Sequence, residues 1–441
     1  MRDPSAVQAP VVSGPPPSRQ FEDATYAKVT RRLVPFLILC YVVAYLDRIN
    51  VGYAKLQMLR DLRFSETVFG LGAGIFFIGY FLFEVPSNIM MHKLGARLWI
   101  ARIMISWGIV SACTLLVRTP TAFYGVRFLL GLAEAGFFPG IILYLTHWYP
   151  ARRRAKMVAT FMVAIPLSGI LGGPISGFIM QFFSGVHGWP GWKWLFLLEA
   201  VPTLLVGVAT LFYLDSGIRH AKWLNEEEKQ LLEGNLAEER KFKIEHPSLL
   251  AVFSDGRVWL MSWIYFSCAM GQYALTFWMP TFVKTAGVKS VLNIGLITAI
   301  PYLATAATMV LLGASADRRL ERRWHLAIPM AAGAAGLVLS VEASLHTVLA
   351  ILFLSIAAAG VIASAPLFWS LPTAFLSGAA AAAGIAVVNS VGNLAGFVSP
   401  YMLGWLKDLT HGDRAGMYCL ALVTVAGAAT VLAVPAKMVN R

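Results

Sequence analysis

Apolar runs of about 20 residues recur along almost the whole sequence, and each is long enough to cross a lipid bilayer as a helix. Of the 441 residues, 58% are hydrophobic and 13% are charged, whereas about a quarter of a soluble domain is charged. The runs do not alternate apolar with polar residues, which excludes a transmembrane β-barrel. The sequence therefore predicts an all-α polytopic membrane protein.

The apolar runs predict twelve transmembrane helices in two bundles of six. A charged segment between the bundles contains the helix-prone run EEEKQLL, which indicates a solvated linker with a surface helix. Six spans, a linker and six further spans are typical of transporters built from two parallel repeats with inverted halves. The predicted parts are a disordered tail (1–30), an N-terminal bundle (31–214), the linker (215–255), a C-terminal bundle (256–436) and a short tail (437–441).

The net charge of +13 reflects Lys and Arg that gather in loops on one side of the predicted spans, including Arg152–Arg154 and the run 317–323. Basic loops stay in the cytoplasm and face anionic lipid. We therefore expect a multi-pass protein of the cell inner membrane with both termini cytoplasmic. Membrane lipid explains the basic charge, so we expect no nucleic-acid partner.

The sequence offers no sign of enzyme chemistry. Its four cysteines lie far apart inside apolar runs, and no Cys/His spacing typical of a metal site occurs. A nucleophile–base constellation and a cofactor motif are also missing. We therefore expect neither an enzyme nor a bound metal or cofactor.

Ionisable side chains are rare inside the predicted spans, so each is a candidate functional residue. Glu84 and Glu199 precede prolines near helix ends, which favours structural roles for both. The C-terminal spans are almost free of charge. The ionisable side chains well inside a span all belong to the N-terminal half: Asp47, Arg48, Glu84, Arg127, Glu134 and Glu199.

Asp47 and Arg48 are adjacent, so on a helix their side chains point about 100° apart. Arg48 can then face a cavity beside Tyr45 and hold a carboxylate with two hydrogen bonds. Asp47 can contact another helix and carry a proton, because a carboxyl group in a low-dielectric site can hold one near neutral pH. A structural ion pair between helices remains the alternative for both residues.

Arg127 and Glu134 are seven residues apart, which places them on one helix face at a separation of about 10 Å. They are too far apart to pair directly, so each needs a partner on another helix, in a solute or in water. For Arg127 the alternative is an arginine at a helix end that reaches for the membrane interface.

The C-terminal half supplies amides and aromatic side chains, which we expect to contact either a substrate or a neighbouring helix. The run SGILGGPISG contains Gly173 and Pro174 and predicts close helix packing and a gating bend. Matching basic loops follow spans two and eight, and the second keeps an Asp–Arg core in Asp317 and Arg318. The C-terminal candidates for substrate contact are Gln272, Tyr273, Trp369, Thr373, Asn389 and Asn393.

Several runs together resemble the anion:cation symporter family of the major facilitator superfamily, from about residue 30 to about residue 436. They include YLDRINVGYA, RFLLGLAEAGFFPGIILYLTHWYP, GGPISG, ADRRLERRWH and GIAVVNS. The resemblance implies a proton-coupled importer of small organic carboxylates. It also implies that Asp47 and Glu134 take part in proton coupling and that Arg48 links substrate to proton. Residues that it places at or near the cavity are Tyr45, Tyr80, Arg127, Trp369, Thr373 and Asn393.

The run FMVAIPL lacks a polar amide that sugar-acid members of this family carry in span five. This departure favours an aromatic or dicarboxylic acid, as in the phthalate, hydroxyphenylacetate and tartrate members, over a sugar acid. Two alternatives stay open: a proton-driven exporter of anions or drugs, suggested by the glycine–proline run of span five, and a ligand sensor that does not transport. We expect a monomer whose partners are the carboxylate, protons and lipid.

Overall fold

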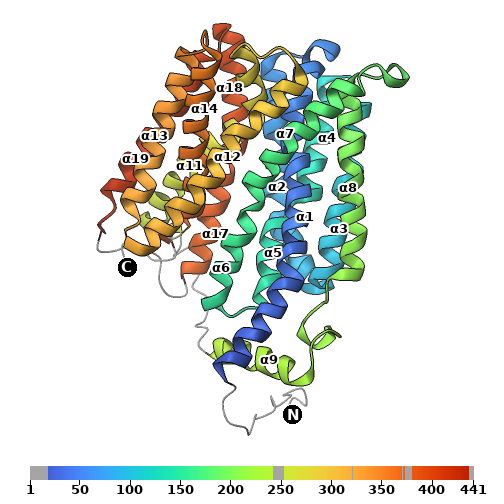
Figure 1. The fold of residues 1–441 in the computed structure, drawn as a ribbon, viewed down its shortest axis with the longest axis vertical. Helices are drawn as coiled ribbons and strands as arrows, with labels where there is room; N and C mark the ends of the chain where they lie inside the picture. Colours follow the sequence, from blue (N-terminus) through green and yellow to red (C-terminus); the bar gives the residue numbers. More distant parts are fainter. Residues whose placement is uncertain (1–17, 242–252, 320, 370, 373–379, 437–441) are drawn as a thin grey trace.

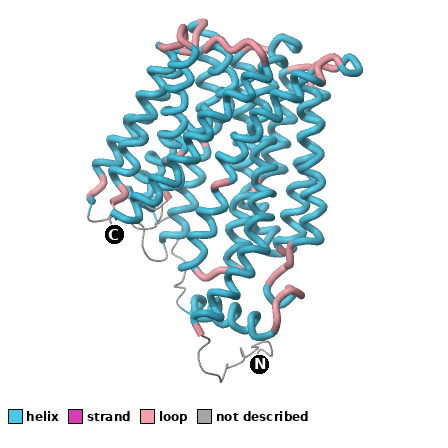
Figure 2. Tube along the Cα trace, in the orientation of Figure 1, coloured by secondary structure: helices cyan, strands magenta, loops and turns pink. Residues whose placement is uncertain are grey.

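The computed structural model describes residues 18–241, 253–319, 321–369, 371–372 and 380–436. Within these ranges the regular structure is entirely helical, and Figure 2 shows long helices joined by short loops. Ten helices in the described part are long and apolar enough to cross a membrane. The helix at Gly256–Thr285 and the broken helix at 380–410 take the two remaining positions, so the predicted arrangement of twelve spans is confirmed.

The N-terminal bundle contains two spans that are each divided into two helices. One break lies at Ala135 and Gly136, where Gly136 adopts a φ of +83° that other residues rarely take. The second break lies at Val163, and the following helix runs on through Pro174. The helices are α1 (Arg19–Leu62), α2 (Glu66–Leu94), α3 (Ala96–Cys113), α4 (Pro120–Glu134), α5 (Phe137–Thr146), α6 (Ala151–Met162), α7 (Ala164–Phe182) and α8 (Gly191–Tyr213), with 3-10 turns at Thr114–Leu116, Val186–Gly188 and Ile218–His220.

The linker contains α9 (Glu226–Lys241), which confirms the surface helix expected at EEEKQLL. The second bundle lies beside the first, and the start of α1 and the end of α19 lie at the same end of the molecule, which we call the termini end (Figure 1). Its helices are α11 (Gly256–Thr285), α12 (Val291–Arg319), α13 (Arg323–Glu342), α14 (Thr347–Ile362), α15 (Ser364–Phe368), α17 (Ala380–Asn393), α18 (Ala395–Thr410) and α19 (Arg414–Ala433).

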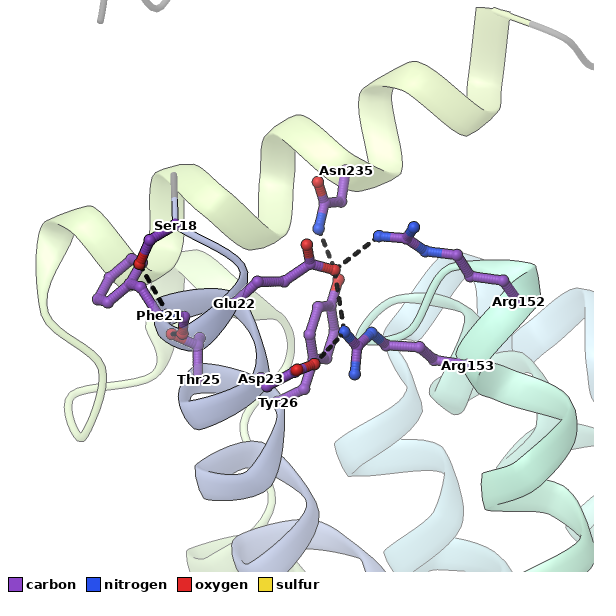
Figure 3. Close-up of polar contacts among 9 residues, drawn as sticks. All are labelled: Ser18, Phe21, Glu22, Asp23, Thr25, Tyr26, Arg152, Arg153 and Asn235. Carbon is purple, nitrogen blue, oxygen red and sulfur yellow. Dashed lines mark hydrogen bonds and ion pairs between the residues drawn. The ribbon is translucent and has the colours of Figure 1, made fainter. Parts of the chain in front are cut away.

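Helix α1 begins at Arg19, so the expectation of a disordered tail is wrong for residues 19–30. Ser18 caps the helix by accepting a hydrogen bond from the Phe21 amide. Figure 3 shows how this extension contacts the basic start of α6: Glu22 pairs with Arg152 at 2.6 Å, and Asp23 pairs with Arg153 at 2.6 Å. These partners lie far away in sequence, which is why the pattern of residues 1–30 alone did not predict the helix.

Helix α9 lies against the same extension of α1. The Lys28 ammonium is 2.8 Å from the Glu228 carboxylate. Asn235 donates a hydrogen bond to the Tyr26 hydroxyl at 3.2 Å, as Figure 3 shows. Partial burial opposes ionisation of Glu228, but the hydrogen bonds from Lys28 and the Asn225 amide outweigh it and lower the pKa of this carboxyl group. The linker helix is therefore attached to the N-terminal bundle at the termini end.

The two bundles meet closely at the end of the molecule away from the termini, which we call the closed end. Helix α7 runs along α12, and α2 runs along α18. A β-carbon placed on Gly173 would overlap the Gly295 carbonyl oxygen and the Thr298 hydroxyl. At this point α7 therefore packs on α12 with no side chain of its own in between. Tyr53 and Thr298 share a hydrogen bond of 2.6 Å across the same contact.

Replacing Gly173 with valine is expected to hold the bundles apart at the closed end, because the new side chain has no space against Gly295 and Thr298. Spin labels on Arg118→Cys and Leu345→Cys, which lie on the two bundles at this end, measure the separation. The label distance should lengthen in the variant. Gly125→Val is the matched control, since a β-carbon there meets nothing within 4 Å. An unchanged distance in Gly173→Val would contradict the close contact.

Candidate functional site

A cavity lies between the two bundles, between the closed end and the termini end. Helices α1, α2 and α5 and the α6–α7 junction line one side of it, and α11, α12, the α14–α15 region and α17 line the other. Its described lining is Tyr41, Tyr45, Arg48, Phe77, Tyr80, Phe138, Met162, Ile165, Pro166, Tyr265, Gln272, Tyr273, Met309, Ile362, Ala365, Pro366, Trp369, Asn389 and Asn393.

Most of the predicted substrate contacts belong to this lining, although they come from five different spans. The two exceptions are Arg127, which lies elsewhere, and Thr373, which lies outside the described residues. Sequence reasoning did not single out Phe77 or Tyr265 for the cavity. The available signal was helical spacing, because Phe77 precedes Tyr80 by three residues and Tyr265 precedes Gln272 by seven.

Arg48 is the one Lys, Arg or His side chain in the described lining of the cavity. Its guanidinium forms an ion pair with Glu134, which lies behind it at the end of α4 and is 3% exposed. The rings of Tyr45 and Phe76 lie 5.3 Å and 5.4 Å from the same guanidinium. The charge that faces the cavity is therefore already balanced by a buried carboxylate.

Asp47 points away from the cavity into the N-terminal bundle and is 2% exposed. Its carboxylate accepts hydrogen bonds from the Trp107 indole at 2.8 Å, the Thr203 hydroxyl at 2.8 Å, the Ser111 hydroxyl at 3.0 Å and the Asn50 amide at 3.3 Å. The structure thus separates Asp47 from Arg48, as the helical geometry predicted. Four hydrogen-bond donors from α1, α3 and α8 therefore stabilise the Asp47 carboxylate, in the role that a cation would play in an ion pair.

Replacing Asp47 with alanine is expected to destabilise the protein by about 2–6 kcal/mol, because the Trp107 and Asn50 donors are left buried without an acceptor. Asp47→Asn keeps one acceptor oxygen and should lose less stability than Asp47→Ala. Thermal unfolding of the purified protein, monitored with a thiol-reactive dye, measures the unfolding midpoints of both variants. Asp23→Ala is the control, since its ion pair lies at the surface and should leave the midpoint unchanged. Equal midpoints for Asp47→Ala and the native protein would contradict this role.

Arg127 is 1% exposed and lies inside the N-terminal bundle, not in the cavity lining. Its Nε donates to the Gly72 carbonyl at 3.4 Å, and its guanidinium lies 5.0 Å from the Phe76 ring. Its Nη2 has no hydrogen-bond partner among the described residues. The structure therefore places Arg127 outside the described cavity lining and away from the membrane interface, with its hydrogen-bond partner on another helix, one of the options that the sequence left open.

The amides of the cavity make specific contacts. Gln272 donates to the Tyr45 hydroxyl at 3.3 Å, which joins the two bundles. Asn389 donates to the Glu84 carboxylate at 3.4 Å, again across the bundles. Within the C-terminal bundle, the Tyr273 hydroxyl donates to Asn393 at 3.0 Å. The sequence left open whether these amides contact substrate or a neighbouring helix, and in this structure they line the cavity while binding other helices.

A cluster of charges at the closed end joins the bundles and was not predicted. Lys55 is 3% exposed, lies 2.6 Å from the Glu66 carboxylate and sits 3.0 Å from the centre of the Trp278 ring. Lys407 lies 3.5 Å from the same carboxylate, and Asp408 accepts a hydrogen bond of 2.8 Å from the Thr67 amide. We call these residues the end cluster. Sequence reasoning missed Lys55 because it follows the predicted end of span one.

The remaining predicted residues lie outside the cavity. Gly173 and Pro174 belong to α7 at its contact with α12. Asp317 and Arg318 lie in the last turn of α12, at the termini end, and Arg318 is exposed. A gating or structural role for these four residues stays a prediction.

Comparison with known families agrees with this architecture, since residues 37–400 match the model of the Major Facilitator Superfamily. The chain belongs to the Major Facilitator Superfamily. It is therefore a membrane transporter and not an enzyme. Among solved structures, the inward-open xylose transporter XylE from E. coli has a TM-score of 0.73 at 15% identity, covering 91% of this chain and 96% of that one. This similarity confirms the fold.

Several curated relatives match over nearly their full length. "Putative metabolite transport protein NicT" of Pseudomonas putida is 50% identical, with 95% of this chain and 96% of the relative covered. A "Putative tartrate transporter" of Agrobacterium vitis is also 50% identical, with 93% and 94% covered. A "Quinolone resistance transporter" of Acinetobacter baumannii is 40% identical, with 95% and 96% covered. The first two of these names are consistent with the anion:cation symporter resemblance found in the sequence.

Proposed function

We propose that this protein imports a small organic carboxylate together with protons, by alternating access across the cell inner membrane with both termini in the cytoplasm. The observation that supports the proposal is the ion pair between Arg48 at the cavity and Glu134 behind it. An arginine cannot give up its proton, so it suits a carboxylate ligand, whereas a buried glutamate can take one up.

The ion pair couples the two cargoes because Arg48 has one counter-ion at a time. While Glu134 is ionised, it neutralises Arg48 and competes with an incoming carboxylate. When Glu134 takes up a proton, Arg48 loses its partner, and a buried cation without a partner is costly. The substrate carboxylate then restores the balance of charge. Proton and anion therefore bind together, and loss of either favours loss of the other.

Asp47 is the second carboxyl group that we propose for proton coupling. Its hydrogen-bond donors include the hydroxyl groups of Ser111 and Thr203, which can rotate to accept a hydrogen bond when Asp47 is protonated. Both charge states can therefore be accommodated without moving a helix. Because Asp47 is adjacent to Arg48, a change at either residue is transmitted along α1.

The contacts between the bundles indicate which state of the cycle the structure represents. The end cluster and the contact of Gly173 with Gly295 close the end away from the termini. With the termini in the cytoplasm, that closed end faces outward. In our scheme an outward-open state forms when these contacts separate, which opens the cavity to external substrate and protons.

The lining of the cavity favours an aromatic acid with one carboxylate as the substrate. Eight aromatic side chains belong to the described lining of the cavity, and they suit stacking against a ring. A dicarboxylate such as tartrate would call for a second cation, but Arg127 lies outside the lining. Tartrate remains the second candidate because two relatives carry that name.

Uptake into proteoliposomes tests the proposal with 4-hydroxyphenylacetate as the probe and L-tartrate as the comparison. A symporter accumulates the probe when the outside is made acidic, and accumulation collapses with a protonophore. An exporter driven by proton antiport, as the quinolone-resistance relative suggests, would accumulate it with the opposite gradient. A ligand sensor would bind the probe but would not exchange labelled for unlabelled acid across the membrane.

A further inference from the structure

Glu199 on α8 is a buried carboxyl group that the mechanism above does not use. It is 5% exposed. Its Oε1 accepts a hydrogen bond from the Ser176 hydroxyl at 2.9 Å, while its Oε2 is buried and has no hydrogen-bond partner among the described residues. No Lys, Arg or His of the described residues lies within 4 Å to form an ion pair with it. A structural ion pair would require such a cation.

The surroundings of Glu199 also carry no positive charge. The titratable groups that face it are Asp47 and Tyr53, both from α1, while α7 presents Ser176. Helix α3, which also packs on α8, directs Trp107 and Ser111 to Asp47. Asn50 interacts with both carboxyl groups, and its Oδ1 is buried without a partner.

A carboxylate in these surroundings would be a buried charge stabilised by Ser176 and Asn50 alone, with a second carboxyl group nearby, which is unfavourable. A proton on Glu199 removes the charge. It also provides the hydrogen-bond donor that this group of acceptor oxygens lacks. The arrangement seen in the closed structure is therefore suited to the protonated form of Glu199.

Glu199 is connected to the contact that closes the outer end. Its partner Ser176 lies between Gly173 and Gly177, two glycines of α7 that pack on α12. Tyr53, which also faces Glu199, bonds Thr298 of α12 across the same contact. Separation of α7 from α12 would bring water to the polar groups beside Glu199.

We propose that Glu199 is a proton-binding site that must be filled before the bundles can close at this end. When the end opens, Glu199 exchanges its proton with water on that side. When α7 returns to α12, water leaves and the carboxyl group must be neutral, so closing takes up one proton per molecule at this site. This inference rests on the proposed transport cycle, but the proton is returned to the side from which it came and is distinct from the transported one.

The spin labels on Arg118→Cys and Leu345→Cys test this without any substrate. In nanodiscs, we expect the closed population to fall as the pH rises from about 6 to about 9, by up to tenfold per pH unit, since each unit changes the proton concentration tenfold. Glu199→Gln keeps an acceptor for Ser176 but cannot ionise, so its closed population should not change with pH at this site. Ser176→Ala removes the donor that favours the carboxylate, and its transition should move to higher pH.

A closed population in the native protein that is constant across this range would overturn the proposal. So would an equal pH response in Glu199→Gln, which would assign the response to Lys55 or another residue of the end cluster. If Glu199→Gln fails to fold, Ser176→Ala gives the deciding result, and an unchanged transition in that variant would also overturn the proposal. Because no carboxylate is added, these outcomes do not depend on whether 4-hydroxyphenylacetate is a substrate.

Discussion

Replacing Arg48 with glutamine should weaken carboxylate binding by roughly 30-fold or more, the largest loss of binding expected from any single change in the cavity. Removing one partner of a buried charged contact typically costs about 2–5 kcal/mol, and each 1.4 kcal/mol is tenfold in affinity. No other Lys, Arg or His in the described lining can take over the role of Arg48. Equilibrium binding of 4-hydroxyphenylacetate to the purified protein at fixed pH measures the loss.

Two further variants show whether charge or geometry accounts for that loss. Arg48→Lys keeps the charge but loses the bidentate hydrogen bonding to the carboxylate, so its affinity should lie between those of the native protein and Arg48→Gln. Arg219→Gln removes an exposed arginine of the linker that pairs with Glu233, and it should bind as the native protein does. If Arg48→Gln kept the native affinity, the cavity would not hold its ligand through Arg48.

Replacing Glu134 with glutamine should abolish concentrative uptake while leaving exchange across the membrane intact. The variant cannot take up or release a proton at this position, so the pH gradient no longer drives the cycle. It also leaves Arg48 without its ionised partner at every pH. Binding of the carboxylate should then be at least as tight as in the native protein and should lose the pH dependence that Glu134 imposes.

The two activities are measured in the same proteoliposomes, as accumulation under an inward pH gradient and as exchange of labelled acid at equal pH. Glu134→Asp is the matched control, because it keeps a titratable carboxyl group and should keep some accumulation. Loss of both activities with normal binding would indicate that Glu134 is needed for the movement of the bundles. Full accumulation in Glu134→Gln would remove Glu134 from the coupling mechanism.

Helical periodicity predicted the local geometry of the site correctly where one helix sufficed. The spacing in YLDRIN implied that Asp47 and Arg48 diverge, and the structure directs them to different surroundings. The partner of Arg48 could not be derived in this way. Glu134 is 86 residues away, and the period of a helix does not say which helices lie side by side.

Arg127 illustrates a second limit of sequence reasoning. It shares a helix face with Glu134, but it lies about two turns nearer the start of α4, at the closed end. The described lining of the cavity includes Arg48 but not Arg127, although the Phe76 ring lies near both guanidinium groups. A shared face therefore predicted burial for both residues, but it did not predict a shared cavity.

Lys55 and the start of α1 show what requires the assembled fold. The environment of Lys55 includes Glu66 and Phe69 of α2 and Trp278 of α11, a helix more than 200 residues away in the sequence. Similarly, Glu22 and Asp23 look like residues of a solvated tail until the start of α6 is placed beside them. Both cases depend on contacts between distant segments, and a single sequence does not supply those contacts.

The central claim is that a proton on Glu134 and a carboxylate on Arg48 bind together, and counting protons during binding tests it most directly. Calorimetric titration with 4-hydroxyphenylacetate, repeated in buffers that differ in ionisation enthalpy, gives the number of protons taken up per bound acid. Near neutral pH we predict an uptake that approaches one proton in the native protein and is lost in Glu134→Gln. Binding by the native protein with no proton uptake at any pH would contradict the mechanism.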